Sequence, residues 1–292
     1  MNNKQLYTII GLLCLILSLQ ACKGGSGNKQ IVSVSILPQK YFVEKIAGDY
    51  LQVNVMIPPG MSPETCDLST EQLKKLYDSN ICFTIGYLPF EVTHLYPVLN
   101  KRNDIRIVNH SEGIQLLNGS CGHQHHDGHG HIGVDPHIWL SPQYAAQMAQ
   151  QIFTALTEQY PTQKDNFEKG YKSLCQEIET VKKKADNNLR EKHGRMFLIY
   201  HPALTYFAAD YGLEQIAIEN EGKEPNPAHL KHIIDLAKEK DIHIIFIQSQ
   251  FDKNNALAVA KEIEGEVISI DPLAENWTEE INKLINVLQE KL

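Results

Sequence analysis

The feature that most constrains the fold of this chain is a repeated alternation between short apolar runs and amphipathic segments. Apolar runs of the first half lie at 31–36, 52–57, 81–85 and 105–108. Their length favours strands, and the segments between the early runs show helical spacing of apolar residues. Strands that alternate with helices predict a parallel sheet with helices on its faces, because parallel neighbours need a crossover connection.

The same rhythm returns in the second half of the chain. Its apolar runs lie at 196–200, 214–218, 243–247 and 266–270, with amphipathic segments between them. A chain of 292 residues also exceeds the usual size of one domain. We therefore predict an α/β protein of two Rossmann-like lobes, each a parallel sheet flanked by helices, at residues 31–160 and 194–292.

A polar segment at 161–193 separates the two predicted lobes. Apolar residues recur in it at steps of three or four, at Phe167, Tyr171, Leu174, Ile178, Val181, Ala185 and Leu189. This pattern predicts one linking helix of roughly 30 residues and about 45 Å. A coiled coil is the alternative, but no second heptad segment is present to pair with it.

The N-terminus is typical of an export signal. Lys4 precedes an apolar run that ends in Leu19-Gln-Ala-Cys22, which resembles a bacterial lipoprotein cleavage site. We predict a signal peptide at 1–21, lipidation of Cys22 and a Gly/Ser-rich flexible tether at 22–30. An uncleaved anchor helix is the alternative, but the apolar run is short for a membrane span. The predicted location is extracytoplasmic and membrane-anchored, in the periplasm or at the cell surface.

The net charge narrows the class of partner, and the cysteine spacing bears on disulfide bonds. The formal net charge is −8, which disfavours nucleic acid as a partner and mildly favours cations. Beyond the predicted signal, the cysteines are scattered, without a CxxC pair or a disulfide framework.

The segment 121–131 interrupts the globular pattern with glycine and histidine. Its histidines are His123, His125, His126, His129 and His131, and Cys121 borders them. Neutral imidazole binds zinc and other late first-row metals, and such a composition builds no packed core. A solvated linker or an accidental tag is the alternative, although tags normally lie at a terminus. The tract therefore predicts metal handling.

Further candidate ligands follow predicted strands. His201 and Asp271 each come directly after a strand of the second half, and the loop 58–67 leaves a strand of the first half. Asp135-Pro-His137 supplies another imidazole. The carboxyl ends of parallel strands meet at one crevice, so these groups are expected to converge. Each alone is often only a hydrogen-bonded structural residue, but together with the histidine tract they favour a metal site.

At this point the chain resembles the zinc/manganese solute-binding lipoproteins of ATP-binding-cassette importers, over essentially all of its length after the signal. The matching segments are Pro58-Pro-Gly-Met-Ser-Pro63, Asp135-Pro-His-Ile-Trp-Leu-Ser-Pro142 behind a histidine-rich insert, the long helix, His201 with Tyr206 and Tyr211-Gly212, Glu224-Pro-Asn-Pro227, Phe246-Ile-Gln-Ser-Gln-Phe251 and Asp271-Pro-Leu273. The resemblance implies a metal clamped between two lobes and delivered to a membrane permease, in a protein that we expect to be monomeric.

One position departs from the family pattern. Where the family normally has a histidine after Ser-Pro, this chain has Glu64. The resemblance then implies the ligands Glu64, His137, His201 and Asp271. Two nitrogens with carboxylate oxygens suit Zn²⁺, and Mn²⁺ is the alternative; the histidine tract favours zinc, since manganese-binding members usually lack one. Cys66 as a thiolate, or a water molecule, is the alternative at the first position.

The expected function is high-affinity capture of zinc and its delivery to an importer. The alternatives are a manganese or iron carrier and a metal-dependent surface adhesin. An enzyme is not expected, because a zinc hydrolase needs an open coordination position and a general base, and no His-Glu-x-x-His occurs. Gln248 and Glu219 are candidates to orient the imidazoles.

Overall fold

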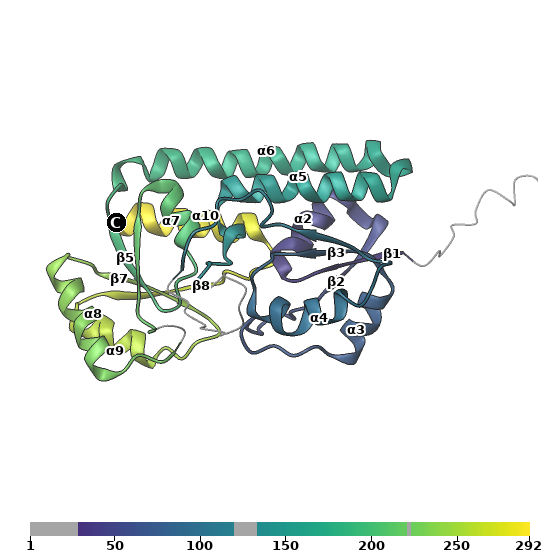
Figure 1. The fold of residues 1–292 in the computed structure, drawn as a ribbon. Coiled ribbons are helices and arrows are strands. Elements are labelled where there is room, and N and C mark those ends of the chain that lie inside the picture. Colours follow the sequence, from purple (N-terminus) through teal and green to yellow (C-terminus); the bar gives the residue numbers. More distant parts are fainter. Residues whose placement is uncertain (1–28, 120–132, 221–222) are drawn as a thin grey trace, which may run out of the picture.

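The computed structural model describes residues 29–119, 133–220 and 223–292, and it shows two α/β lobes side by side beneath a long helix (Figure 1). The predicted signal peptide, Cys22 and the histidine tract at 121–131 lie outside the described residues, as does most of the predicted tether. Within those ranges, no helix combines the length and the apolarity that a bilayer crossing needs.

Each lobe contains a parallel sheet of four strands. The N-terminal sheet has the order β2-β1-β3-β4, and the C-terminal sheet has the order β6-β5-β7-β8. The strands are β1 (Gln30–Val34), β2 (Leu51–Val55), β3 (Ser79–Thr84), β4 (Arg106–Asn109), β5 (Met196–Ile199), β6 (Glu214–Ala217), β7 (Ile244–Gln248) and β8 (Glu266–Ile270). The two orders are the same, so the predicted fold class and its repetition are confirmed.

The helices cover both faces of each sheet (Figure 1). They are α2 (Leu37–Ala47), α3 (Thr70–Tyr77), α4 (Tyr96–Leu99), α5 (Pro142–Gln159), α6 (Lys164–Asn188), α7 (Thr205–Tyr211), α8 (Pro227–Glu239), α9 (Asn254–Glu262) and α10 (Trp277–Lys291). A capping box opens α3: Gln72 N donates to Ser69 Oγ at 3.2 Å, and Ser69 N donates to Gln72 Oε1 at 3.0 Å. A π-helical turn at Glu91–Leu95 was not predicted.

The long helix α6 connects the lobes, as predicted, but it is shorter than 161–193. It has 25 residues, and 3₁₀ turns at Pro161–Gln163 and Arg190–Lys192 flank it. Such turns are frequent at helix ends, where the hydrogen-bond pattern tightens. Its buried residues are Phe167, Leu174, Ile178, Val181 and Ala185. They pack on α2 and α5 at one end and on α10 at the other.

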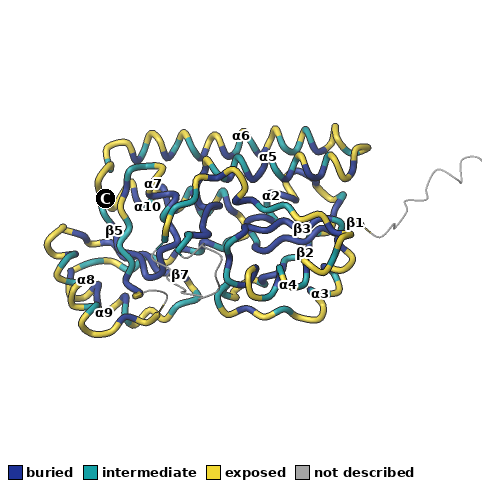
Figure 2. Tube along the Cα trace, in the orientation of Figure 1, coloured by how far each residue is buried: buried dark blue, intermediate teal, exposed yellow. Residues whose placement is uncertain are grey.

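One hydrophobic core runs through both lobes. It includes Val32 and Phe83 of the N-terminal sheet, Phe207 and Phe246 of the C-terminal lobe, and Trp277 at the start of α10. A second cluster lies beneath α8 and α9, on the opposite face of the C-terminal sheet. Figure 2 shows the buried residues along the strands and the inner faces of the helices. The shared core holds the two lobes together at the α2, α6 and α10 side.

Gly170 sets how closely α6 approaches α2. A Cβ at this position would lie 2.5 Å from the carbonyl oxygens of both Lys45 and Ile46. Alanine normally stabilises a helix interior by about 1 kcal/mol relative to glycine. Here we expect Gly170→Ala to lower the free energy of unfolding by about 1–3 kcal/mol, because the helices must separate. Urea denaturation beside the exposed Ser173→Ala on the same helix checks this, and equal effects would contradict it.

His110, which follows β4, makes stability depend on pH. Its ring is buried, stacks on Phe83 with centroids 5.7 Å apart, and donates from Nδ1 to Gln151 Oε1 at 2.8 Å. Burial lowers the pKa of His110 to about 4 from 6.5. As the pH falls below 6.5, the unfolded chain binds a proton that the folded chain does not, so stability is lost on acidification.

We expect protonation of His110 in the unfolded chain to lower the free energy of unfolding by about 2 kcal/mol between pH 7 and pH 5. Burial raises the pKa of Glu91 to about 6, and this group acts in the opposite direction over the same interval. Comparing the wild type with His110→Phe therefore isolates the histidine. Denaturation curves at both pH values should show a smaller acid loss in the variant, and identical losses would rule the assignment out.

Candidate metal site

Two of the four predicted ligands meet where the lobes adjoin. His201 follows β5, and His137 precedes the 3₁₀ turn Ile138–Leu140. Their ring centroids lie 5.2 Å apart, with the ring planes at 70°. His137 is 8% exposed and His201 is 7% exposed. The structure thus brings together two nearly buried imidazoles from segments far apart in the sequence.

A carboxylate fixes each of these rings. Asp135 Oδ1 lies 2.8 Å from His137 Nδ1, and Glu219 lies 3.0 and 3.1 Å from His201 Nδ1 through its two oxygens. A carboxylate accepts only, so each Nδ1 carries the proton and the lone pair of each ring lies on Nε2. Metal-binding histidines are oriented in this way, with Nε2 facing the ion. Both rings are therefore in the tautomer that binds a metal.

The buried carboxylates also make the site favourable for positive charge. Burial alone would lower the pKa of His201, but the hydrogen bond and charge of Glu219, with the nearby Glu64, raise it overall. Burial would likewise raise the pKa of Asp135, yet the contacts with His137 and Thr205 keep it below its usual value. Asp135 is thus a buried anion, and positive charge on the His201 imidazole is stabilised.

Glu64 lies beside the imidazole pair. Its Oε1 is 3.6 Å from His201 Nδ1, and its side chain is 24% exposed. The loop is held where Glu64 N donates to Ser62 Oγ at 3.2 Å and Phe90 N donates to Pro63 O at 3.0 Å. The carboxylate is on the Nδ1 side of the ring, so it must turn to reach an ion at Nε2.

Asp271 follows β8 and borders a cavity of about 250 Å³. This cavity lies between the segments 57–60 and 273–275, which come from different lobes. One oxygen of Asp271 accepts from Leu273 N at 3.1 Å. Among the described residues, no three histidine, cysteine, aspartate or glutamate side chains form a group that could hold a metal as they stand. The four-ligand set therefore stays a prediction.

Cys66, the alternative first ligand, lies in the N-terminal core. It is 3% exposed, and its Sγ donates to Asp67 O at 3.6 Å. Burial, with the charge of Asp67, raises the pKa of the thiol. A thiol that holds its proton is a poor metal ligand.

Sequence reasoning found one orienting residue and missed another. Glu219 binds the His201 ring, as expected. Gln248 instead binds the backbone of His201, donating to its carbonyl oxygen at 2.6 Å. Asp135 was not recognised as the partner of His137, although a carboxylate two residues before a histidine is the signal that would have found it.

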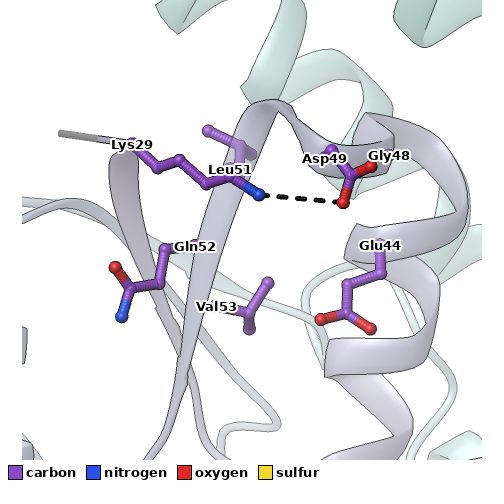
Figure 3. A pocket seen from close by; sticks show the side chains of 7 residues that line it. All are labelled: Lys29, Glu44, Gly48, Asp49, Leu51, Gln52 and Val53. Carbon is purple, nitrogen blue, oxygen red and sulfur yellow. Dashed lines mark ion pairs between the residues drawn. The ribbon is translucent and has the colours of Figure 1, made fainter. Parts of the chain in front are cut away.

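A second hollow lies away from the imidazoles. It has a volume of about 610 Å³ beside the edge strand β2. Figure 3 shows Glu44 of α2 on the side of Val53 of the strand, and Lys29 is paired with Asp49, just beyond α2, at 3.7 Å. It contains no histidine. The imidazole pair thus remains the candidate for chemistry.

Comparisons with known proteins identify the family of the chain. The model of the family described as ZnuA, zinc-uptake complex component A, periplasmic, matches residues 32–292. The chain belongs to this family. The resemblance to metal-capturing solute-binding proteins is thereby confirmed, and the family is described as an uptake component rather than an enzyme.

Relatives extend over both lobes. A crystal structure of ZnuA is 32% identical and superposes with a TM-score of 0.81, covering 90% of this chain and 99% of that one. The high-affinity zinc uptake system protein ZnuA of Bacillus subtilis is 25% identical over 278 residues, 91% of this chain and 86% of that protein. The zinc-binding lipoprotein AdcA of Streptococcus pneumoniae strain R6 is 27% identical over 303 residues, and the match takes in 99% of this chain but 60% of AdcA.

We expect the carboxylate of Glu219 to contribute more to zinc affinity than to the free energy of folding. We expect Glu219→Gln to weaken zinc binding about 10- to 100-fold, because a neutral amide can donate as well as accept, so it fixes the tautomer of His201 less strictly, and it does not stabilise positive charge on the ring. Competition with a chromogenic zinc chelator measures this. Glu214→Gln, an exposed change on the neighbouring strand β6, is the control, and matching affinities for the two variants would contradict the role.

Proposed function

We propose that this protein captures Zn²⁺ outside the cytoplasm and delivers it to the permease of an ATP-binding-cassette importer. The observation that carries the proposal is the buried pair His137 and His201, 5.2 Å apart, each with its own carboxylate on Nδ1. Imidazoles in this tautomer carry their free lone pair on Nε2, which is the atom that would bind a late first-row metal. The family and the zinc-binding names of its members support zinc as the cargo.

Glu64 and Asp271 complete the proposed ligand set. The two imidazoles are neutral ligands, so these two carboxylates would balance the charge of a divalent ion. Glu64 is favoured over Cys66 at the first position, because it lies 3.6 Å from His201 and the thiol is buried and protonated. Glu64 Oε1 lies 3.6 Å from His201 Nδ1, and Asp271 borders the cavity between the lobes, so these two side chains would turn toward the ion while the histidines stay in place.

The segments outside the described residues have proposed roles as well. Lipidation at Cys22 would tether the protein to the membrane, where a permease receives the ion. The histidine tract at 121–131 would bind zinc weakly and raise its concentration near the lobes. Such a tract increases the rate of capture without forming the high-affinity site.

The proposal predicts which variants lose zinc. Alanine at His137, His201 or Asp271 should weaken zinc binding at least tenfold, as should Glu64→Ala, because removing one of four ligands opens the ion to water. Competition calorimetry with Zn²⁺ and Mn²⁺ measures this, and zinc-limited growth reports uptake. His243→Ala removes an exposed imidazole of the same lobe and is the control.

Two outcomes would show that the proposed site is wrong, and two others would favour an alternative function. Full-strength zinc binding in all four alanine variants would show that the site is elsewhere. Loss of high-affinity binding on deletion of 121–131 would place it in the tract. Preference for Mn²⁺ over Zn²⁺ would support the manganese alternative, and normal uptake in cells lacking the protein, with loss of surface attachment, would support an adhesin.

A further inference from the structure

The segment 135–141, which carries His137, is held largely by the C-terminal lobe. Thr205 Oγ1 donates to Asp135 Oδ2 at 2.5 Å, and Tyr206 OH donates to Asp135 O at 2.7 Å. At the other end, Ser141 Oγ donates to Asp210 at 2.5 Å. All three partners belong to α7, the helix that follows His201. Asp135 N in turn donates to Leu117 O, on the N-terminal side.

Two indole N–H groups connect the middle of this segment, around Trp139, to the C-terminal lobe. Trp139 Nε1 donates to Pro272 O at 2.7 Å, and Trp277 Nε1 donates to Trp139 O at 2.7 Å. Both side chains are almost fully buried. The ring of Trp139 also lies against the ring of His137, with centroids 5.1 Å apart. Trp139 therefore touches one proposed ligand and binds the residue that follows another, Asp271.

We propose that Trp139 is a positioning residue of the metal site, which locks the segment bearing His137 to the segment bearing Asp271. The inference rests on the proposed function. Because β5 and β8 belong to the same sheet, this bond places His137 in one unit with His201 and Asp271. Glu64, on a loop of the N-terminal lobe, is outside that unit.

This arrangement should lengthen the time for which zinc stays bound to the protein. A ligand set is effective when its members are held in place before the ion arrives. Breaking the bond to Pro272 O lets His137 and Asp271 move independently, so the ion loses ligands one at a time. The change should appear mainly as faster dissociation of zinc.

The test is Trp139→Phe in the full chain, which keeps an aromatic ring and removes the N–H donor. We expect zinc to dissociate about tenfold faster into excess chelator, as for loss of other outer groups that orient ligands. Tyr96→Phe is the matched control, since it removes one hydrogen bond, to Thr84 Oγ1 at 3.0 Å, inside the N-terminal lobe. Its dissociation rate should stay within about twofold of the wild type.

The two tryptophans supply a second measurement. In Trp277→Phe, Trp139 is the sole tryptophan, and zinc should change its emission because its ring lies against His137. In Trp139→Phe, Trp277 alone should respond much less. Trp277→Phe also breaks the bond to Trp139 O, so it should raise the dissociation rate in the same direction even if Trp139→Phe does not fold.

The outcomes separate this inference from the proposed function. If His137→Ala abolishes tight binding but Trp139→Phe releases zinc no faster than Tyr96→Phe, the inference is wrong and the site stands. An emission of Trp139 that does not respond to saturating zinc also overturns it. If His137→Ala binds zinc as the wild type does, the proposed site is wrong and the inference fails with it.

Discussion

The burial of two histidine rings against each other is the constraint on which this molecule depends. Neutral imidazole needs a partner for its N–H when it leaves water, and an unpaired polar group in the interior costs about 1–3 kcal/mol. Asp135 and Glu219 supply these partners. Thr205 and Tyr206 of α7 form hydrogen bonds with Asp135 in turn. These hydrogen bonds satisfy the N–H of each buried ring, and they also leave the Nε2 lone pair of each ring available to a metal.

Much of this fold was predictable from local patterns. Strands and helices were found from apolar spacing, because burial on one face imposes a period on the sequence. The ends of α6 were not predicted, since the flanking 3₁₀ turns have three residues each and are too short to show a period. The π-helical turn at Glu91 was not predicted either. The Glu91 carboxylate accepts hydrogen bonds from the backbone of Ile85, Gly86 and Leu88, and no sequence pattern predicts such bonds.

The candidate site was predictable to a lesser degree. Strand ends placed His201 and Asp271 correctly at one edge of one sheet, because topology alone decides that. The partner of each imidazole depends on side-chain orientation, so Glu219 was only one of two candidates and Asp135 was not considered. The bonds of Gln248 to the backbone of His201 show the same limit, since an amide at the end of a strand has several partners within reach.

A carrier differs from a structural zinc protein in what folding requires. In a zinc finger, the ion supplies the folding free energy, and its release unfolds the domain. Here the shared core joins the lobes, and each imidazole donates its Nδ1 hydrogen bond to a protein carboxylate. Folding therefore does not depend on the ion, and cargo can leave without loss of the fold. In the proposed site, the side chains that would turn toward the ion are those of Glu64 and Asp271, while the imidazoles keep their hydrogen bonds.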